Sequence, residues 1–328
     1  RKFIDMYAGR LRNQVSFMLS ACNFYMPIFE EALDAYGLPL ELRYLPIIES
    51  ALNPSAVSRA GASGLWQFMI GTGKIYGLES NSLVDERRDP IKATWAAARY
   101  LKEMYDIYGD WNLVIAAYNC GPGTINKAIR RANGETDYWK IYNYLPKETR
   151  GYVPAFIAAN YVMTYYCDHN ICPMETNIPA STDTVQVNQN LHFEQIADLC
   201  NVPLDQIKSL NPQYKKQMIP GDSKPYTLRL PIDAISTFID KQDTIYAHRA
   251  DELFRNRKTV AVKDITPATR KTTSAVAGKG NLTYHTIKSG DTLSTIAGKY
   301  GVTIKDIQRW NGMSSTKIAA GKRLKIYK

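Results

Sequence analysis

The chain of 328 residues lacks the long apolar runs and the leader segment that mark many envelope proteins. No apolar stretch approaches the roughly 20 residues that a membrane-spanning helix requires. The first residues, Arg1 to Asp5, contain no apolar core of the signal-peptide type. Because the chain begins without Met, we expect that an export or lipid-anchor segment has been removed ahead of Arg1.

Cysteine and histidine are scarce, with five and four residues respectively. None of them forms a CxxC pair or a Cys/His cluster with zinc-ligand spacing, so we expect no metal. Cys167 and Cys172 flank four residues and could form a disulfide in an oxidising compartment. Buried free thiols fit the sequence at least as well. The odd number of cysteines means that not all of them can pair within the chain.

The formal net charge of +10 is concentrated at the C-terminal end. Residues 1–180 carry 18 Lys/Arg and 18 Asp/Glu, whereas residues 258–328 carry 14 and 3, a local charge of +11. A basic segment attracts anionic polymers over long range. No nucleic-acid-binding signature accompanies it, so nucleic acid is not an expected partner. Anionic wall polymers and an ordinary solvated basic surface are the two remaining interpretations.

Residues 1–175 have the apolar spacing of helices, for example at Leu11, Val15 and Leu19. Asp89 before Pro90 predicts an N-cap followed by proline at the first helical position. Asn53-Pro54 predicts the end of the helix that carries Glu49. Gly121-Pro122-Gly123 predicts a turn that presents Tyr118 and Asn119 at a helix end, and it lacks the GxxxxGK[ST] pattern of a phosphate loop.

An internal repeat at a spacing of 100 residues organises the second half of the chain. Ile196-Ala197 matches Ile296-Ala297, and Asn211 matches Asn311. Each copy predicts a strand, two short helices and a strand. Between the copies, residues 232–256 have the pattern of one amphipathic helix, and residues 258–281 have the Thr/Ala/Lys/Gly composition of a flexible linker.

Four motifs in the first half resemble one enzyme family when they are taken together. They are the runs around Glu49 (LPIIES), Gln67 (GASGLWQFM), Asn119 (AAYNCGPG) and Tyr152 (ETRGYVP). Their order and spacing resemble the soluble lytic transglycosylase family, with a goose-lysozyme-like catalytic domain, and most closely its membrane-bound murein transglycosylase D branch. Residues 284–297 resemble a LysM module, a family that binds N-acetylglucosamine-containing polymers. The first copy departs from this pattern, with Asn190-Leu191-His192-Phe193 where the second has Gly290-Asp291-Thr292-Leu293.

The resemblance implies that Glu49 is the catalytic acid. The apolar residues before Glu49 would raise its pKa by disfavouring the anion. Most glycosidases use two carboxylates, whereas this family implies one that acts as acid and then as base. Glu49 would protonate the glycosidic oxygen and then accept the proton of the C6 hydroxyl, which attacks C1 to give a 1,6-anhydro product.

The other implied site residues are carried over by motif position. Ser58, Gln67, Met69, Tyr118 and Asn119 would line the cleft, and Glu148 and Tyr152 would complete its far wall. Tyr118 would form a hydrogen bond near Glu49 or the substrate N-acetyl group, and Ser50 would be structural. Tyr118 and Tyr152 could instead be buried core residues, and Glu148 could pair with a cation such as Arg150.

The expected architecture is multidomain, with a mainly α, lysozyme-like catalytic domain followed by small α+β (βααβ) LysM modules. The expected boundaries are 1–178 for the catalytic domain, 183–232 for a degenerate LysM-like module, 233–281 for a helix and basic linker, and 282–328 for a LysM module. The expected substrate is the GlcNAc-MurNAc strand of peptidoglycan, without a cofactor, in the bacterial periplasm or cell envelope. The alternatives are a goose-type lysozyme or chitinase-like hydrolase and a catalytically silent wall-binding protein.

Overall fold

The computed structural model describes residues 1–176, 178–179, 181–254, 282–288, 291–311, 313, 316, 318–319 and 321–327. The chain divides into two compact units, Arg1–Thr266 and Pro267–Lys328. The predicted linker, residues 258–281, lies outside the described residues, as do Ser289 and Gly290 of the LysM-like motif.

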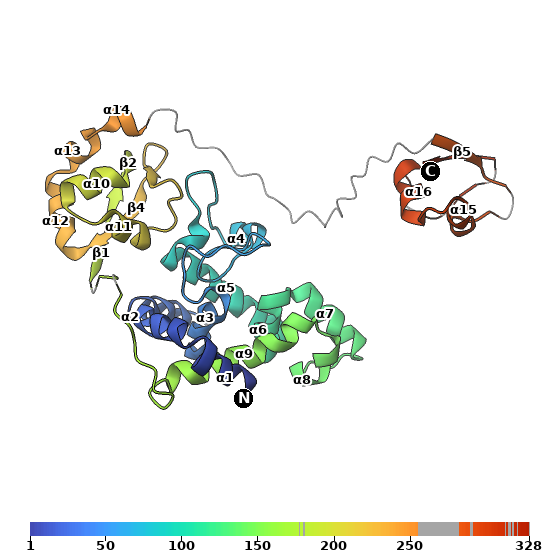
Figure 1. Ribbon diagram of the computed structural model, residues 1–328, viewed down its shortest axis with the longest axis horizontal. Coiled ribbons are helices and arrows are strands. Elements are labelled where there is room, and N and C mark those ends of the chain that lie inside the picture. Colours follow the sequence, from blue (N-terminus) through green and yellow to red (C-terminus); the bar gives the residue numbers. More distant parts are fainter. Residues whose placement is uncertain are drawn as a thin grey trace. The chain divides into compact units, whose positions relative to one another are not determined.

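Residues 2–164, here called the helical domain, contain helices and no strand of a sheet among the described residues (Figure 1). Its elements are α1 (Lys2–Asp5), η1 (Met6–Arg10), α2 (Arg12–Ala35), η2 (Leu40–Tyr44), α3 (Leu45–Ser50), α4 (Ile70–Ile75), η3 (Glu86–Arg88), α5 (Pro90–Tyr108), α6 (Trp111–Cys120), α7 (Pro122–Arg131), α8 (Tyr138–Ile141), η4 (Tyr142–Tyr144) and α9 (Lys147–Thr164). Helix α2 packs against α5, and α6 packs against α9.

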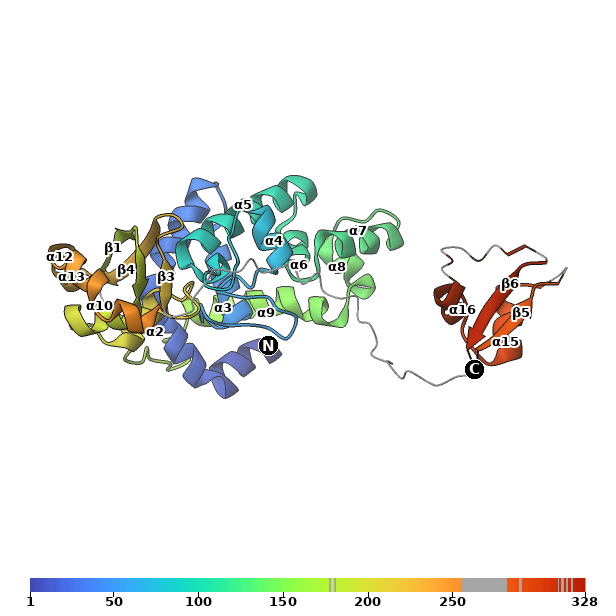
Figure 2. The same cartoon turned by 90° about the horizontal axis from the view of Figure 1, so that it is seen from above.

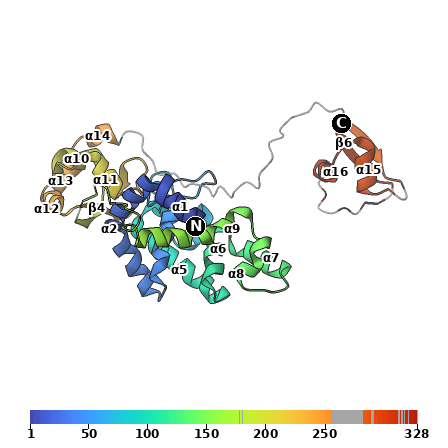
Figure 3. The ribbon, with the colours of Figure 1, turned by 60° about the horizontal axis from the view of Figure 1, so that its bottom comes forward.

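The helical domain has one hydrophobic core, to which most of these helices contribute. Trp66 is fully buried in it, packs edge-on against Phe29, and donates its indole N–H to Thr94 Oγ1 at 2.9 Å. Helix α1 lies along α9, so that the N-terminal segment is beside the helix that carries Tyr152 (Figure 3). This packing brings the two ends of the helical domain to the same region.

The predicted helix boundaries are confirmed at one position and corrected at another. Asp89 caps α5, because its Oδ1 accepts the N–H groups of Ile91 at 2.9 Å and Lys92 at 3.0 Å. Helix α3, which carries Glu49, ends at Ser50 and not at Asn53-Pro54. The physical reason is that Ala51 adopts a left-handed backbone with φ of 51°, which ends the helix before the proline is reached.

The first module, residues 182–231, contains β1 (Thr182–Val187), β2 (Asn190–His192), α10 (Phe193–Cys200), α11 (Leu204–Leu210), β3 (Met218–Pro220) and β4 (Tyr226–Pro231). Strands β1 and β4 lie side by side (Figure 2) and are antiparallel, with Val187 opposite Tyr226. Strand β2 pairs with β3. The predicted strand–helix–helix–strand order is confirmed, with one additional short β2–β3 ladder.

The second module, residues 282–327, contains β5 (Leu282–Thr286), α15 (Leu293–Tyr300), α16 (Ile304–Asn311) and β6 (Arg323–Tyr327). Strands β5 and β6 are antiparallel, with His285 opposite Leu324. The predicted order is again confirmed. The expected fold class, a mainly α domain followed by small α+β modules, therefore holds.

The predicted single helix over residues 232–256 is wrong. The structure divides it into α12 (Ile232–Asp240), α13 (Gln242–Ala247) and α14 (Ala250–Leu253). The break between α13 and α14 has a packing reason, because Gln195 of α10 donates its amide to the carbonyls of Tyr246 at 3.1 Å and His248 at 2.7 Å. These bonds fold the segment back onto the first module instead of letting it continue as a straight helix.

Candidate active site

Glu49 lies near the end of α3, the short helix whose residues Leu45, Pro46 and Ile47 are buried in the core. The side chain of Ser50 ties this helix to a neighbouring loop, since its Oγ is 3.0 Å from the carbonyl oxygen of Pro46 and 2.9 Å from that of Leu65. Ser50 is therefore structural, as expected. The rigid, apolar helix fixes the position of the Glu49 carboxyl.

The environment of Glu49 favours its protonated form. Burial raises the pKa of Glu49 to about 7, a hydrogen bond from the Tyr152 hydroxyl opposes this rise, and the negative charge of Glu148 adds to it. Removing a carboxylate from water disfavours the anion, whereas a donor directed at the anion favours it. An acid with a pKa near 7 can both give and accept a proton at neutral pH.

A cavity of about 500 Å³ opens beside the Glu49 carboxyl. Its walls come from η1, α2, α3 and the segments around Ser58 and Gln67; the lining residues are Met6, Tyr7, Leu11, Gln14, Met18, Ile47, Ile48, Glu49, Ser50, Ala51, Ala56, Val57, Ser58 and Gln67. Among these described residues, Glu49 is the only carboxylic acid. The cavity therefore has apolar walls, a few polar groups and one carboxylic acid among its described lining residues, which suits the faces and hydroxyls of a sugar.

Three of the predicted site residues, Glu49, Ser58 and Gln67, line this cavity. Gln67 has a left-handed backbone with φ of 48°. Its amide N–H₂ group donates to the carbonyls of Gly64 at 2.8 Å and Ala56 at 3.3 Å. With both donors engaged, the side-chain oxygen is the atom through which Gln67 can accept a hydrogen bond. Ser58 Oγ accepts the N–H of Ala62 at 3.0 Å, so its hydroxyl hydrogen can be donated elsewhere.

The loop of residues 61–68, here called the Gln67 loop, rests on a buried ion pair. The guanidinium of Arg87 lies 2.8 Å from the Asp85 carboxylate, and the two side chains are only 6% and 3% exposed. Arg87 Nη1 donates to the carbonyls of Gly61 at 2.8 Å and Phe68 at 2.9 Å. These two bonds hold both ends of the loop, so the Asp85–Arg87 pair fixes the backbone on which Gln67 is carried.

Tyr118 and Asn119 lie in the last turn of α6, ahead of Gly121, whose φ of 81° ends the helix. This agrees with the predicted turn. The Tyr118 hydroxyl donates to the carbonyl of Trp66 at 2.7 Å, and its pKa is raised well above the usual value by burial and by the charge of Glu49. Asn119 Oδ1 accepts the Thr149 hydroxyl at 2.9 Å. Neither residue is among those that line the cavity.

Glu148 and Tyr152 are one turn apart on α9, on the side that meets α3. Glu148 is exposed, and in the described structure no ion pair joins it to Arg150, which instead donates to the carbonyls of Leu145 at 3.0 Å and Asn143 at 2.8 Å. Met69 is half-buried at the start of α4 and does not line the cavity. The roles expected for these residues toward substrate remain predictions.

Two groups of site residues were missed by sequence reasoning. Met6, Tyr7 and Gln14 line the cavity, although the sequence shows only a helical segment there. The Asp85–Arg87 pair was also missed, because neighbouring charges in a sequence are usually solvated. The only signal for these lining residues in the sequence was the helical spacing that includes Leu11. That spacing does not indicate which part of the fold the helix packs against.

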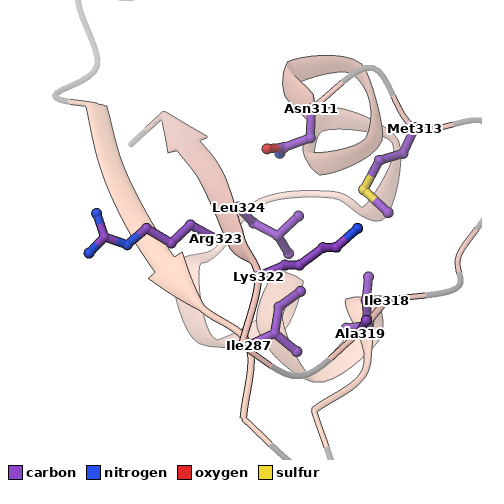
Figure 4. Close-up of a pocket in the computed structure, with 8 residues that line it drawn as sticks. All are labelled: Ile287, Asn311, Met313, Ile318, Ala319, Lys322, Arg323 and Leu324. Carbon is purple, nitrogen blue, oxygen red and sulfur yellow. The ribbon is translucent and has the colours of Figure 1, made fainter.

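The second module has a pocket of its own, with a volume of about 430 Å³ (Figure 4). Its lining combines apolar side chains, two cations and one amide, namely Ile287, Asn311, Met313, Ile318, Ala319, Lys322, Arg323 and Leu324. His285, a residue of β5, lies 2.9 Å from the Asp291 carboxylate and 3.0 Å from the Tyr300 hydroxyl, which ties this strand to α15.

The described residues contain no group of three or more His, Cys, Asp or Glu side chains arranged to hold a metal ion. Within the same residues, no helix is both long and apolar enough to cross a membrane. All five cysteines are free thiols, with Cys167 and Cys172 exposed and Cys200 buried. The disulfide considered for Cys167 and Cys172 is therefore not formed in this structure.

Comparison with known protein families matches three segments of the chain. Residues 26–141 match the transglycosylase SLT domain, residues 181–247 the LysM-like domain of lytic transglycosylase MltD, and residues 285–326 the LysM domain. The chain therefore contains an SLT-type transglycosylase domain, followed by a LysM-like segment and a LysM segment. The resemblance seen in the four motifs is confirmed.

Two curated relatives come from Escherichia coli K12. The chain is 33% identical to membrane-bound lytic murein transglycosylase D over 294 residues, which cover 88% of this chain and 60% of that protein. It is 33% identical to the soluble lytic murein transglycosylase over 124 residues, covering 36% of this chain and 19% of the relative. The chain thus spans about 60% of the length of the transglycosylase D relative.

Among solved structures, the 70 kDa soluble lytic transglycosylase SLT70 from Escherichia coli matches with 29% identity and a TM-score of 0.38. That match covers 44% of this chain and 24% of SLT70.

Proposed function

We propose that this protein is a peptidoglycan lytic transglycosylase that cleaves the β-1,4 bond between MurNAc and GlcNAc and forms 1,6-anhydro-MurNAc. The observation that supports it most is Glu49, an acid with a pKa of about 7 at the wall of a 500 Å³ cavity. The SLT-domain match and the transglycosylase D relative support the same activity.

In the proposed mechanism Glu49 acts twice. The protonated carboxyl gives its proton to the glycosidic oxygen while the bond from that oxygen to C1 breaks. The carboxylate then accepts the proton of the C6 hydroxyl on the same ring, whose oxygen bonds to C1. No water is consumed, and Glu49 ends the cycle protonated. The N-acetyl group of the substrate would stabilise the positive centre, as in substrate-assisted glycosidases.

The surroundings of Glu49 fit both halves of this cycle. Burial keeps part of the population protonated at neutral pH, which is required to protonate a poor leaving group. The hydrogen bond from Tyr152 stabilises the carboxylate that forms in between. Gln67 and Ser58 line the same cavity, and the Gln67 side-chain oxygen and the Ser58 hydroxyl would position sugar hydroxyl or amide groups.

A hydrolase of the goose-lysozyme or chitinase type would need a further group to position water. No second carboxylic acid is among the described residues that line the cavity. This favours transglycosylation, and product chemistry tests it. Purified sacculi incubated with the protein are expected to release muropeptides ending in 1,6-anhydro-MurNAc, one water lighter than hydrolysis products by mass spectrometry. Reducing ends would establish the hydrolase instead.

The Glu49→Gln variant tests the role of the acid. It is expected to fold and to lose activity by about 10²–10⁴-fold, the range usual for loss of a general acid or base. Activity close to that of the wild type would contradict the assignment. Wild-type protein that gives no products but still binds sacculi would support the alternative of a silent wall-binding protein.

We further propose that the second module binds peptidoglycan strands and that the protein acts in the bacterial cell envelope, in the periplasm. The LysM match, the pocket of Figure 4 and the basic charge of residues 258–328 support this. A tethered module raises the local concentration of its polymer near the enzyme. Deletion of residues 258–328 is expected to lower retention on sacculi more than turnover of soluble glycan fragments. Unchanged retention would contradict this role.

A further inference from the structure

The two modules can be aligned residue by residue through one pair of asparagines. Asn211 donates its amide to the carbonyls of Ile207 and Arg229 and accepts the N–H of Arg229, all at 2.8–2.9 Å. Asn311 forms the same three bonds with Ile307 and Lys325, at 2.7–2.9 Å. Each asparagine bonds to the backbone of one residue in the last strand of its module, Arg229 in β4 and Lys325 in β6. Arg229 and Lys325 are therefore equivalent, and so are the residues beside them in the two strands.

This alignment shows which residues of the first module correspond to the pocket of the second. The pairs are Gln213 with Met313, Tyr226 with Lys322, and Leu228 with Leu324. In the second module these positions surround a pocket of about 430 Å³ (Figure 4). The first module places the same positions against another part of the chain.

That part is the segment of residues 79–85 of the helical domain, here called the plug segment. Its backbone forms bonds with the first module, from Asp85 N–H to the Gln213 carbonyl at 2.9 Å and from Lys215 N–H to the Leu83 carbonyl at 2.8 Å. Val84 and Tyr214 form a β-bridge between these bonds. The plug segment thus adds a short strand-like edge to the module.

The side chains of the plug segment are part of the module's own core. Leu83 is 1% exposed and Val84 is fully buried. Both belong to the hydrophobic cluster of the first module, which includes Val187, Met218, Ile219, Tyr226 and Leu228, and not to the core of the helical domain. At the rim, the Glu79 carboxylate lies 3.2 Å from the Tyr226 hydroxyl and 2.7 Å from the Lys224 ammonium.

We propose that the first module is an intramolecular docking module and not a glycan-binding module. The position at which the second module has an open pocket is filled in the first by Leu83 and Val84 of the helical domain. A sugar could reach this position only by displacing two buried apolar side chains and two backbone hydrogen bonds. The departures of the first module from the LysM pattern suit a module whose partner is a peptide segment of the same chain.

The docking has a consequence for the candidate active site. Asp85 is fixed through its N–H by the first module, and its carboxylate holds the Arg87 guanidinium. Arg87 in turn holds the carbonyls at the two ends of the Gln67 loop. A continuous set of buried bonds therefore runs from the first module to the loop that lines the cavity, and Arg87 is a positioning residue in that set.

Hydrogen exchange of the full chain tests the docking without any assay of activity, so its outcome is independent of the proposed enzyme function. Leu83→Asp places a carboxylate in the shared core. Amides of residues 80–88, 213–215 and 61–68 are expected to exchange at least about 100-fold faster than in the wild type, while α10 keeps its protection. The matched control is Ile239→Asp, the same kind of change at a side chain that is 57% exposed on α12; it should leave all of these amides unchanged.

Unchanged exchange at residues 80–88 and 213–215 in a folded Leu83→Asp variant would overturn the proposal. If that variant does not fold, the wild type provides the test, because rapid exchange of the Asp85 and Lys215 amides would show that the contact does not hold. A hexamer of N-acetylglucosamine added to the wild type is expected to leave residues 211–228 unaffected. Protection of those amides by the hexamer would show that the first module binds glycan and would overturn the proposal as well.

Discussion

The Tyr152 hydroxyl donates a hydrogen bond to Oε1 of Glu49, joining α9 to α3 across 103 positions of sequence. This bond lowers the pKa of Glu49, in opposition to burial and to the charge of Glu148, both of which raise it. Tyr152 and Glu148, which both lie on α9, therefore shift the pKa of Glu49 in opposite directions. The pH dependence of activity can separate their effects.

We predict that Tyr152→Phe moves the alkaline limb of the pH–activity profile to higher pH. Loss of the hydrogen bond removes a group that stabilises the Glu49 anion, so the pKa of Glu49 rises. Maximal activity should fall at the same time, because the carboxylate formed during the cycle loses its donor. Release of 1,6-anhydro products from sacculi between pH 5 and 9 measures both effects. A limb that moves to lower pH would contradict the role given to Tyr152.

Glu148→Gln should move the same limb in the opposite direction. The negative charge of Glu148 raises the pKa of Glu49, and the neutral amide removes that contribution. Glu148 is exposed, so the shift should be smaller than that of Tyr152→Phe and should shrink further at high salt. Exposed Glu41 provides the matched control, since Glu41→Gln should leave the profile unchanged. Equal shifts in both variants would mean that the effect does not come from proximity to Glu49.

Glu49→Gln should stabilise the fold at alkaline pH. The pKa of Glu49 in the native state is about 7, above the usual 4.5. Between pH 4.5 and about 7, Glu49 is therefore protonated in the native state and ionised in the unfolded state. Wild-type stability therefore decreases as pH rises through that window and is lower by a constant amount above it. Allowing for the partial exposure of Glu49, the gain in the variant should be about 1–3 kcal/mol at pH 8 and near zero at pH 4. Urea unfolding at the two pH values measures it, and a gain that is the same at both would contradict it.

The motifs around Glu49 could be recognised in the sequence because they are local and keep their order along the chain. Sequence alone could not show that Tyr7 and Gln14 line the same cavity, since their place depends on packing of η1 and α2 against distant elements. It also could not show that Arg87 is buried. A guanidinium becomes tolerable in the interior only when its donors find acceptors, and here these are Asp85 and two carbonyls that lie 19 and 26 residues earlier in the sequence.

The internal repeat is a second case in which the sequence showed a match but not its three-dimensional consequence. The match of Asn211 with Asn311 was visible in the sequence, and both residues form the same bonds. The occupation of one pocket position by Leu83 and Val84 was not visible, because an apolar pair in a loop does not indicate which core it enters.

Gly64→Ala should be severely destabilising. A Cβ at this position would lie 1.7 Å from the carbonyl oxygen of Arg87, and the backbone φ of 87° is unfavourable for any side chain. Gly61 isolates the second effect, because it has the same φ, while a Cβ added there would meet no atom within 4 Å. Gly61→Ala should cost about 1–2 kcal/mol, the strain of a left-handed residue. Gly64→Ala should cost about 4 kcal/mol or more by urea unfolding. Similar losses in both variants would show that Gly64 does not press against Arg87.

The two asparagines should differ in what their removal unfolds. Asn211→Ala leaves the backbone N–H and C=O of Arg229 and the carbonyl of Ile207 without their side-chain partner at a site that is only 1% exposed. Each buried group left unsatisfied costs about 1–3 kcal/mol, so the first unit, which includes the candidate active site, should unfold at lower temperature.

Asn311→Ala removes the same bonds from the second unit, where the asparagine is half-buried. It should lower the melting of that unit and the retention on sacculi while the release of soluble muropeptides from short glycan fragments stays unchanged. Calorimetry of both variants separates the two units, since the first module shares a core with the helical domain through Leu83 and Val84. A loss of first-unit stability in Asn311→Ala, or its absence in Asn211→Ala, would contradict that division.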